Sequence, residues 1–332
     1  MDDKRFEEPQ GFHWGRFQND AGAEIRYGHA KADGEARGVV VMVGGFREHA
    51  EKYFEVINEM KADGLDVWFM DWRGQGGSER CLKDEPQKAH HNGYEEQIET
   101  LHKFTQEVVK TNGKPLILSA HSMGAHLGLR YLKEHAGVFD SAIMTAPMVD
   151  ILTGGMPKPL ARKLAQFAKA GGYLEKFIPG GGPWTPGKEK FEVNELTSDP
   201  DRWQVQRTVF EEKPELQIGD PTYGWVYHTF RSIDILVQED YLKSIDTPVL
   251  MEISGKDTVV DKNAAKRAAD LMPNCQTVDI PDAKHEIWME RDDLRKLWTA
   301  EVRDFLDQRL KGVAVTPKKS NTHKPPRPPQ PA

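Results

Sequence analysis

PLILSAHSMG, residues 115–124, joins a short apolar run to the start of a helical pattern. A continuous apolar run such as PLILSA is typical of a strand buried on both faces of a parallel sheet. Ser122 stands between the two, in the pattern A-H-S-M-G, which matches the strand–turn–helix motif G-x-S-x-G except at its first position. Such a turn lifts the serine hydroxyl above the sheet edge, where a helix N-terminus favours developing negative charge. Ser122 is therefore a candidate nucleophile, in a turn built with Ala120, His121 and Gly124.

The same alternation of apolar runs and helical patterns extends along the chain. Further strands are expected at 38–45, 65–71, 139–146, 248–255 and 275–280, and helices at 47–63, 95–110, 123–135, 262–271 and 292–310. Residues 13–29 read as an antiparallel hairpin. This order predicts an α/β fold with a mostly parallel central sheet flanked by helices.

The alternation is interrupted between residues 147 and 240, which hold glycine clusters, three tryptophans and helical patches. We interpret this stretch as a mainly helical cap inserted into a core formed by 10–146 and 241–312. Residues 313–332 carry six prolines and four basic side chains without an acid, which predicts a disordered tail. The tail offers a weak attraction for anionic lipid headgroups or a PxxP-type ligand, but an unselected solvated tail is the simpler reading.

The composition excludes several classes of protein. The net charge of −7 divides into −11 on residues 1–312 and +4 on the tail, so no nucleic-acid partner is expected. Two cysteines, Cys81 and Cys275, cannot form a disulfide framework and suit a reducing compartment. The apolar runs are shorter than the roughly 20 residues of a membrane-spanning helix, and the charged start lacks the apolar core of a signal peptide. We expect a cytoplasmic protein.

A serine hydroxyl needs a base, and the base needs an orienting group. Asp257 follows the strand at 248–255, and His285 follows the strand at 275–280. The order serine, aspartate, histidine is that of α/β-hydrolases, and each residue follows a strand, where α/β sheets place their chemistry. Each residue alone also has a structural interpretation. Ser122 is equally consistent with the N-cap of a helix, Asp257 is consistent with a carboxylate in a turn, and His285 is consistent with a histidine in a surface loop. The three together predict a catalytic triad.

An oxyanion hole requires two backbone N–H groups. Met123, directly after the serine, supplies one. The sequence VGGFREHAEKY at 43–53 supplies the other, because Gly44 and Gly45 allow a close backbone approach and leave Phe46 N–H as the donor. Without Ser122, the same stretch would read as an ordinary glycine-rich turn.

Together these segments resemble the serine-aminopeptidase-like hydrolases, the α/β-hydrolase family that contains bacterial lysophospholipases and monoacylglycerol lipases. The resemblance covers about residues 10–310. The family's H-G-x-G-E-H loop stands here as GGFREH at 44–49, with Gly44 for the leading histidine and Arg47 for the second glycine. Its D-x-R-G-x-G-x-S segment is DWRGQGGS at 71–78, and NELTSDPDRW and PTYGWVY, at 194–203 and 221–227, resemble cap segments of the lysophospholipase branch.

The resemblance implies a lysophospholipase or monoacylglycerol lipase that cleaves carboxylic esters of lipids through an acyl-enzyme, with no cofactor and no metal. A lipid ester is the expected small-molecule partner, peripheral contact with the inner membrane through the cap or the tail is compatible with this reading, and the oligomeric state stays open. Cap residues that could line an acyl pocket, or merely pack the cap, are Met156, Leu160, Phe167, Phe177 and Trp184. Other readings also stay open: another esterase, thioesterase or peptidase, an acyltransferase, or a catalytically silent binding protein on the same fold.

Overall fold

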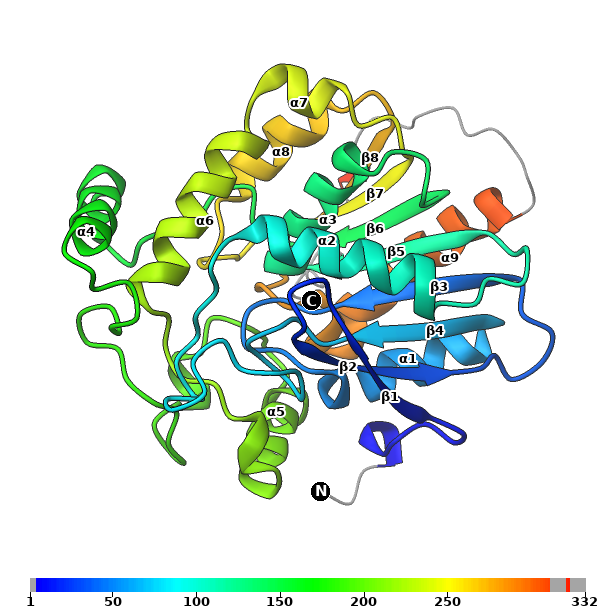
Figure 1. Ribbon diagram of the computed structural model, residues 1–332. Coiled ribbons are helices and arrows are strands. Elements are labelled where there is room, and N and C mark those ends of the chain that lie inside the picture. The colour runs from blue at the N-terminus through cyan, green and yellow to red at the C-terminus, as the bar shows by residue number, and fades with distance from the viewer. Residues whose placement is uncertain (1–3, 311–320, 323–332) are drawn as a thin grey trace, which may run out of the picture.

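The structure, a computed structural model that describes residues 4–310 and 321–322, is built on one nine-stranded sheet (Figure 1). The strand order is β1-β2-β4-β3-β5-β6-β7-β8-β9. β1 and β2 pair antiparallel, as do β2 and β4, and every other pair is parallel. The strands are β1 (His13–Gln18), β2 (Glu24–Ala30), β3 (Gly38–Val43), β4 (Leu65–Met70), β5 (Leu116–His121), β6 (Ser141–Thr145), β7 (Val249–Ser254), β8 (Cys275–Ile280) and β9 (Asn321–Thr322).

Helices cover both faces of the sheet. The core helices are α1 (Phe54–Ala62), α2 (Tyr94–Lys103), α3 (Met123–Glu134), α8 (Lys262–Leu271) and α9 (Asp292–Leu310), with short turns η1 (Lys4–Phe6), η2 (Ala50–Tyr53), η3 (Phe104–Val108) and η6 (Ile287–Met289). β3 shows how the faces divide, because successive side chains of a strand point to opposite sides. Val41 belongs to the apolar cluster that includes residues of α2, α3 and α8, whereas Val40 belongs to the cluster that includes residues of α1 and α9.

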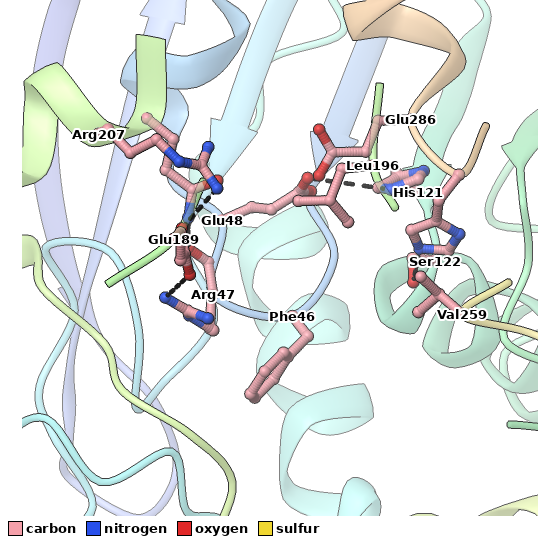
Figure 2. Close-up of a pocket in the computed structure, with 12 residues that line it drawn as sticks. Phe46, Arg47, Glu48, His121, Ser122, Glu189, Leu196, Arg207, Val259 and Glu286 are labelled. Atoms are coloured by element: carbon pink, nitrogen blue, oxygen red, sulfur yellow. Dashed lines mark hydrogen bonds and ion pairs between the residues drawn. The ribbon is translucent and has the colours of Figure 1, made fainter. Parts of the chain in front are cut away.

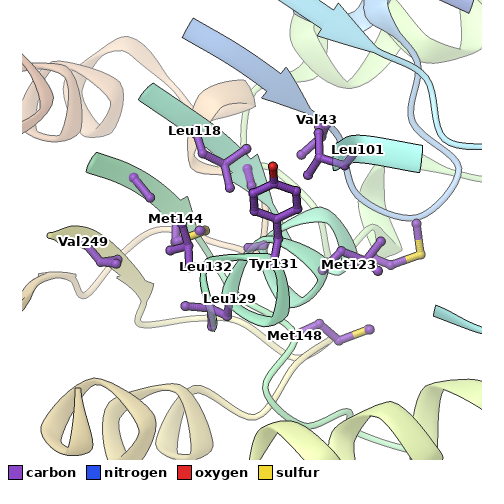
Figure 3. Packing of buried hydrophobic residues seen from close by; sticks show 14 of the residues in the cluster. Val43, Leu101, Leu118, Met123, Leu129, Tyr131, Leu132, Met144, Met148 and Val249 are labelled. Atoms are coloured by element: carbon purple, nitrogen blue, oxygen red, sulfur yellow. The ribbon is translucent and has the colours of Figure 1, made fainter. Parts of the chain in front are cut away.

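Helix α3 is the element that carries the serine turn, and it is buried along most of its length. Figure 3 shows Leu129 and Leu132 of α3 beside Leu118 of β5 and Met144 of β6. An apolar surface of this extent, removed from water on several sides, holds the start of the helix rigidly against the sheet.

The cap lies between β6 and β7. It contains α4 (Lys158–Ala170), η4 (Phe191–Val193), α5 (Pro200–Glu212), η5 (Pro214–Leu216), α6 (Tyr223–Leu236) and α7 (Glu239–Lys243). In Figure 1, α4 projects from the edge of the molecule, away from the sheet. The predicted α/β-hydrolase architecture with a helical insertion is confirmed. The exact domain boundaries at 10–146, 147–240 and 241–312 stay a prediction.

Two helices differ from the sequence-based expectation. The helix expected at 47–63 begins only at Phe54 after a 3-10 turn, because Arg47 adopts a left-handed backbone with φ of 66° that no α-helix can contain. The helix expected at 95–110 ends at Lys103 and continues as the π-turn η3. Of the segment 313–332, only β9 is described, beside β8, and the rest of that prediction lies outside the described residues. No described helix is long and apolar enough to cross a membrane.

Candidate active site

The turn after β5 holds Ser122 in a strained backbone conformation, with φ of 51° and ψ of −114°. The turn is tight because Gly124 lies against the loop that follows β3, residues 44–49, which we call the oxyanion loop after its predicted role. A Cβ at position 124 would stand 2.4 Å from the carbonyl oxygen of Gly44. Ala120 takes the place of the motif's first glycine inside β5, where it pairs with Val43 and Met144 in ordinary strand geometry. An added methyl group is therefore accommodated at this position.

The Ser122 hydroxyl does not cap α3, although Ser122 occupies the N-cap position. Its Oγ lies 2.9 Å from Nε2 of His285, and Nδ1 of His285 lies 2.7 Å from Oδ2 of Asp257. Ser122, Asp257 and His285 follow β5, β7 and β8. These strands lie in one part of the sheet, in the order β5-β6-β7-β8. The tertiary structure thus brings together the three residues that sequence order had grouped.

The electrostatics of the group follow from burial and pairing. Asp257 Oδ1 accepts hydrogen bonds from Val259 N and Val260 N, at 2.7 and 3.0 Å. Burial alone would raise the pKa of Asp257, but the facing His285 and these two amides hold it below its usual value. Burial would lower the pKa of His285, yet the Asp257 carboxylate more than offsets this and raises it above 6.5. The pair is built to stabilise a proton on the imidazole.

The loop between β3 and η2 supplies the second predicted oxyanion donor. Gly45 packs so closely that a Cβ there would lie 3.0 Å from the Cβ of Ser122. Phe46 lines the cavity beside Ser122, and neither Phe46 N nor Met123 N donates a hydrogen bond to another described residue. Both amides are therefore available to a ligand, as the sequence analysis predicts for an oxyanion hole.

A buried charged cluster, which was not among the features predicted from the sequence, supports this loop. Glu48 accepts hydrogen bonds from Gly45 N and from Tyr53 Oη, the latter at 2.6 Å. Lys52 Nζ lies 2.7 Å from Glu48 and 2.6 Å from Glu286, which follows His285 directly. The ammonium of Lys52 thus links the oxyanion loop to the loop that carries His285 and Glu286, which we call the histidine loop. The spacing of Glu48 and Lys52, one helical turn apart, was the only local signal for this contact.

The same cluster is the one group of side chains in the described residues with donors close enough together for a metal. Glu48, His121 and Glu286 each offer one ligand atom within 4.8 Å of the others. Lys52 already pairs with both carboxylates, and burial lowers the pKa of His121 to about 3 in spite of Glu48. The ammonium of Lys52 therefore already supplies the positive charge that a metal ion would bring to these two carboxylates.

A cavity of about 120 Å³ opens in front of Ser122 (Figure 2). Its walls carry both polar and apolar groups: Phe46, Arg47, Glu48, His121, Ser122, Glu189, Leu196, Gln206, Arg207, Val259, His285 and Glu286. A second, mostly apolar cavity of about 470 Å³ lies within the cap, and residues of α4 and α6 are among those that line it. The ring of Phe46, from the first cavity, stands 4.8 Å from the ring of Trp225, which lines the second. The walls of the two cavities are therefore in contact through one aromatic pair.

The cap residues expected to line an acyl pocket divide into three groups. Met156 lines the apolar cavity. Leu160 and Phe167, both on α4, are exposed at 47% and 71%. Trp184 packs in a small separate core with Phe210 and Leu216, and Phe177 lies beside the cavity-lining Ile178 without lining the cavity itself. For Leu160, Phe167 and Trp184, an acyl-lining role is therefore not what the structure favours.

The sheet order, the inserted cap and the serine turn place this protein in the class of α/β-hydrolases. Within that class, the sequence matches the serine aminopeptidase S33 family of hydrolases over residues 34–292, and the chain belongs to that family.

Comparison with individual proteins agrees with this assignment. The chain is 29% identical to lysophospholipase L2 of Escherichia coli K12 over 296 residues, covering 86% of this chain and 84% of that protein. It is 27% identical to monoacylglycerol lipase of Mycolicibacterium smegmatis over 193 residues, covering 56% and 60% of the two chains. The crystal structure of a soluble variant of monoglyceride lipase from Saccharomyces cerevisiae superimposes with a TM-score of 0.71 at 18% identity, covering 93% of this chain and 99% of that one.

Proposed function

We propose that this protein is a serine hydrolase that cleaves the carboxylic ester of a lipid with one acyl chain, a lysophospholipid or a monoacylglycerol. The observation that carries the proposal is the chain of contacts from Ser122 Oγ to His285 Nε2 and from His285 Nδ1 to Asp257, at 2.9 and 2.7 Å. The names of its relatives, lysophospholipase and monoacylglycerol lipase, supply the substrate class.

In this mechanism Ser122 Oγ attacks the ester carbonyl carbon while His285 Nε2 takes the hydroxyl proton. Phe46 N and Met123 N donate hydrogen bonds to the oxyanion, and Asp257 stabilises the imidazolium. When the carbon–oxygen bond to the glycerol breaks, His285 returns the proton to the leaving oxygen. A water molecule then repeats the sequence on the acyl-enzyme and releases the fatty acid.

The apolar cavity within the cap is the proposed place for the acyl chain. With about 470 Å³ it is larger than the Ser122 cavity, and Trp225 in its wall contacts Phe46 in the wall of that cavity. Apolar walls of this kind stabilise a buried hydrocarbon chain through the area they remove from water.

Replacement of the nucleophile tests the proposal. Ser122→Ala should lower kcat for lysophosphatidylcholine and monoacylglycerol by roughly 10⁶-fold, as loss of a triad serine does elsewhere, and should abolish labelling by a fluorophosphonate. Ser141→Ala is the matched control, because Ser141 is a buried serine of β6 whose hydroxyl has no partner among the described residues. Full esterase activity in Ser122→Ala would refute the mechanism.

A panel of substrates separates the other activities that this fold supports. Faster turnover of thioesters or aminoacyl amides than of lipid esters would replace the proposed substrate class. Transfer of the acyl group to an added alcohol would indicate an acyltransferase, and an unlabelled, inactive wild-type protein would indicate a binding protein.

We further propose that helix α4 makes a peripheral contact with an anionic membrane. The helix carries Lys158, Arg162, Lys163 and Lys169 and no acidic residue, and its Leu160 and Phe167 are exposed. A basic helix with exposed apolar side chains favours the interface of an anionic bilayer. A cytoplasmic location at the inner membrane is compatible with this contact and stays a prediction.

Vesicle sedimentation tests this contact. Phe167→Ser should weaken binding to phosphatidylglycerol vesicles by about tenfold, because a buried phenyl group contributes on the order of 1.5–3 kcal/mol. Val193→Ser, at an equally exposed cap residue outside α4, should have no effect. Equal binding of wild-type protein to neutral and anionic vesicles would contradict the electrostatic part of the proposal.

A further inference from the structure

Two arginines lie in the Ser122 cavity at the side away from the serine (Figure 2). Arg47 belongs to the oxyanion loop, and Arg207 belongs to α5 of the cap. Arg47 Nη2 donates to Glu189 Oε1 at 2.9 Å, and Arg207 Nη2 donates to the other oxygen of the same carboxylate. One carboxylate thus serves two guanidinium groups, and the trio carries a net positive charge.

Both guanidinium groups keep an unused donor. The Nε atoms of Arg47 and Arg207 are buried and have no hydrogen-bond partner among the described residues. A buried donor without an acceptor costs free energy, and this cost is recovered when a ligand brings an acceptor to it. Arg47 and Arg207 both line the cavity, and two guanidinium groups with spare donors point to an anionic ligand with several oxygens, since a guanidinium is suited to bind phosphate.

The two arginines are held in place before any ligand arrives. Arg47 keeps a left-handed backbone with φ of 66°, and its N–H and carbonyl are bound by Gln75 and Gln206, at 3.1 and 3.0 Å. The guanidinium carbon of Arg207 lies 3.8 Å from the ring centre of Trp203. Preorganised donors of this kind lose little conformational freedom on binding.

The charges along the cavity would orient such a ligand. Glu48 and Glu286, which lie between Ser122 and the arginines in Figure 2, share Lys52 and leave one negative charge unbalanced. An anionic group is repelled from this middle section and attracted to the arginine end. Glu189 and Arg207 also border a further cavity of about 200 Å³, which provides room beyond them.

We propose that Arg47 and Arg207 form a subsite for the phosphate of an acylglycerophosphate headgroup, and that Glu189 is the carboxylate which the phosphate partly displaces. This inference rests on the proposed function, since the ester carbonyl lies at Ser122 when the phosphate lies at the arginines. The subsite makes the two arginines specificity-determining residues that favour a phosphate-bearing lysolipid over a neutral monoacylglycerol of the same chain length.

The test compares kcat/KM for lysophosphatidic acid and for a monoacylglycerol with the same acyl chain. Arg47→Gly and Arg207→Met should each lower the ratio of the two values by about 10- to 100-fold, the effect of losing a hydrogen bond to a charged group. Glu189→Gln should raise the ratio, because it removes the competing negative charge. Arg303→Met, at an exposed residue of α9, is the control and should leave the ratio unchanged.

Binding of sn-glycerol 3-phosphate, measured by calorimetry, gives a readout independent of turnover. Wild-type protein should bind it more tightly than inorganic phosphate or glycerol, and Arg47→Gly should bind it at least tenfold more weakly. An equal fall for both substrates, or unaltered binding in Arg47→Gly and Arg207→Met, would overturn the subsite. If wild-type protein hydrolyses neither ester but binds glycerol 3-phosphate through the arginines, the subsite stands and the proposed function fails.

Discussion

At the scale of single residues, the proposed mechanism makes the reactivity of Ser122 depend on the charge state of His285. His285 and Asp257 are both buried, and their contact of 2.7 Å is shielded from water. In that mechanism the neutral imidazole is the base, so protonation of His285 in the free protein should remove activity. The Asp257 carboxylate holds the pKa of this imidazole above 6.5.

This predicts an acid limb in the pH profile of kcat/KM, with activity lost as the pH falls through the raised pKa of His285. In Asp257→Asn the largest influence that raises the pKa of the imidazole is lost, while burial still lowers it and only the weaker effects of Glu286 and Glu48 still raise it. The pKa of His285 should therefore fall, and the acid limb should move to lower pH. The maximal rate should also fall by about 10⁴-fold, as in other triads. Asp246→Asn, at an exposed aspartate, is the control. A limb that does not move in Asp257→Asn would contradict the assigned role of Asp257.

At the scale of elements, the close packing of α3 against the oxyanion loop sets the geometry of the serine turn. Gly124 has room for a hydrogen only, because a Cβ would lie 2.4 Å from Gly44 O and 3.0 Å from Val43 O. Both neighbours are backbone atoms at the end of β3, and they cannot move without shifting the loop that carries Phe46 N.

Gly124→Ala should therefore reduce the free energy of unfolding by about 1–3 kcal/mol, the usual cost of overpacking, and should lower esterase activity through displacement of the oxyanion donors. Urea unfolding and turnover measure the two effects. Gly34→Ala should change neither, because no heavy atom lies within 4 Å of a Cβ at that position. Normal stability and activity in Gly124→Ala would show that the loop can adjust.

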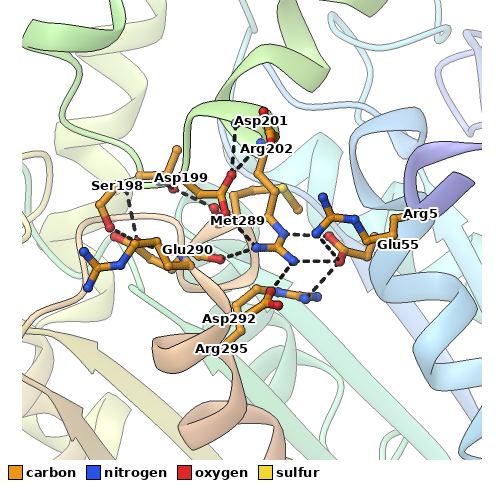
Figure 4. Close-up of polar contacts among 12 residues, drawn as sticks. Arg5, Glu55, Ser198, Asp199, Asp201, Arg202, Met289, Glu290, Asp292 and Arg295 are labelled. Carbon is orange, nitrogen blue, oxygen red and sulfur yellow. Dashed lines mark hydrogen bonds and ion pairs between the residues drawn. The ribbon is translucent and has the colours of Figure 1, made fainter. Parts of the chain in front are cut away.

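At the scale of the whole molecule, one buried arginine joins the cap to the core. Arg202 of α5 donates to Glu55 of α1 at 2.7 and 2.8 Å, to Asp292 of α9 at 2.7 Å and to the carbonyl of Glu290 at 2.9 Å (Figure 4). The Glu290 side chain in turn accepts a hydrogen bond from Lys284 N, next to His285. This network fixes the base of the cap and the histidine loop to the same point.

Arg202→Met leaves the buried Glu55 with only part of its partners, so it should lower the free energy of unfolding by about 3–5 kcal/mol, as for other broken buried ion pairs. Arg303→Met, which removes an exposed ion pair with Asp63, should cost no more than about 1 kcal/mol. Denaturant unfolding followed by fluorescence compares them. A loss in Arg202→Met as small as in the control would mean that the network does not anchor the cap.

Local patterns in the sequence were sufficient for β1 to β8, most clearly where strands buried on both faces appear as continuous apolar runs such as GVVVMV at 38–43. They did not predict β9, which lies in the segment 313–332. They were also sufficient to nominate Ser122, Asp257 and His285, since the carboxyl ends of parallel strands meet at one edge of the sheet. The start of α1 was misplaced because the left-handed backbone of Arg47 depends on Gln75 and Gln206, which are distant in the chain.

By itself the sequence determined the α/β architecture, the order of the three candidate catalytic residues and the presence of an insertion, because each is written in short-range periodicity and in the order of segments. Only the tertiary structure decided which charged side chains from distant parts of the chain form ion pairs. Lys52 pairs with Glu286, 234 positions away, and Arg47 pairs with Glu189, 142 positions away. Neither contact has a local pattern, because ion pairs of this kind depend on where the folded chain places two distant loops.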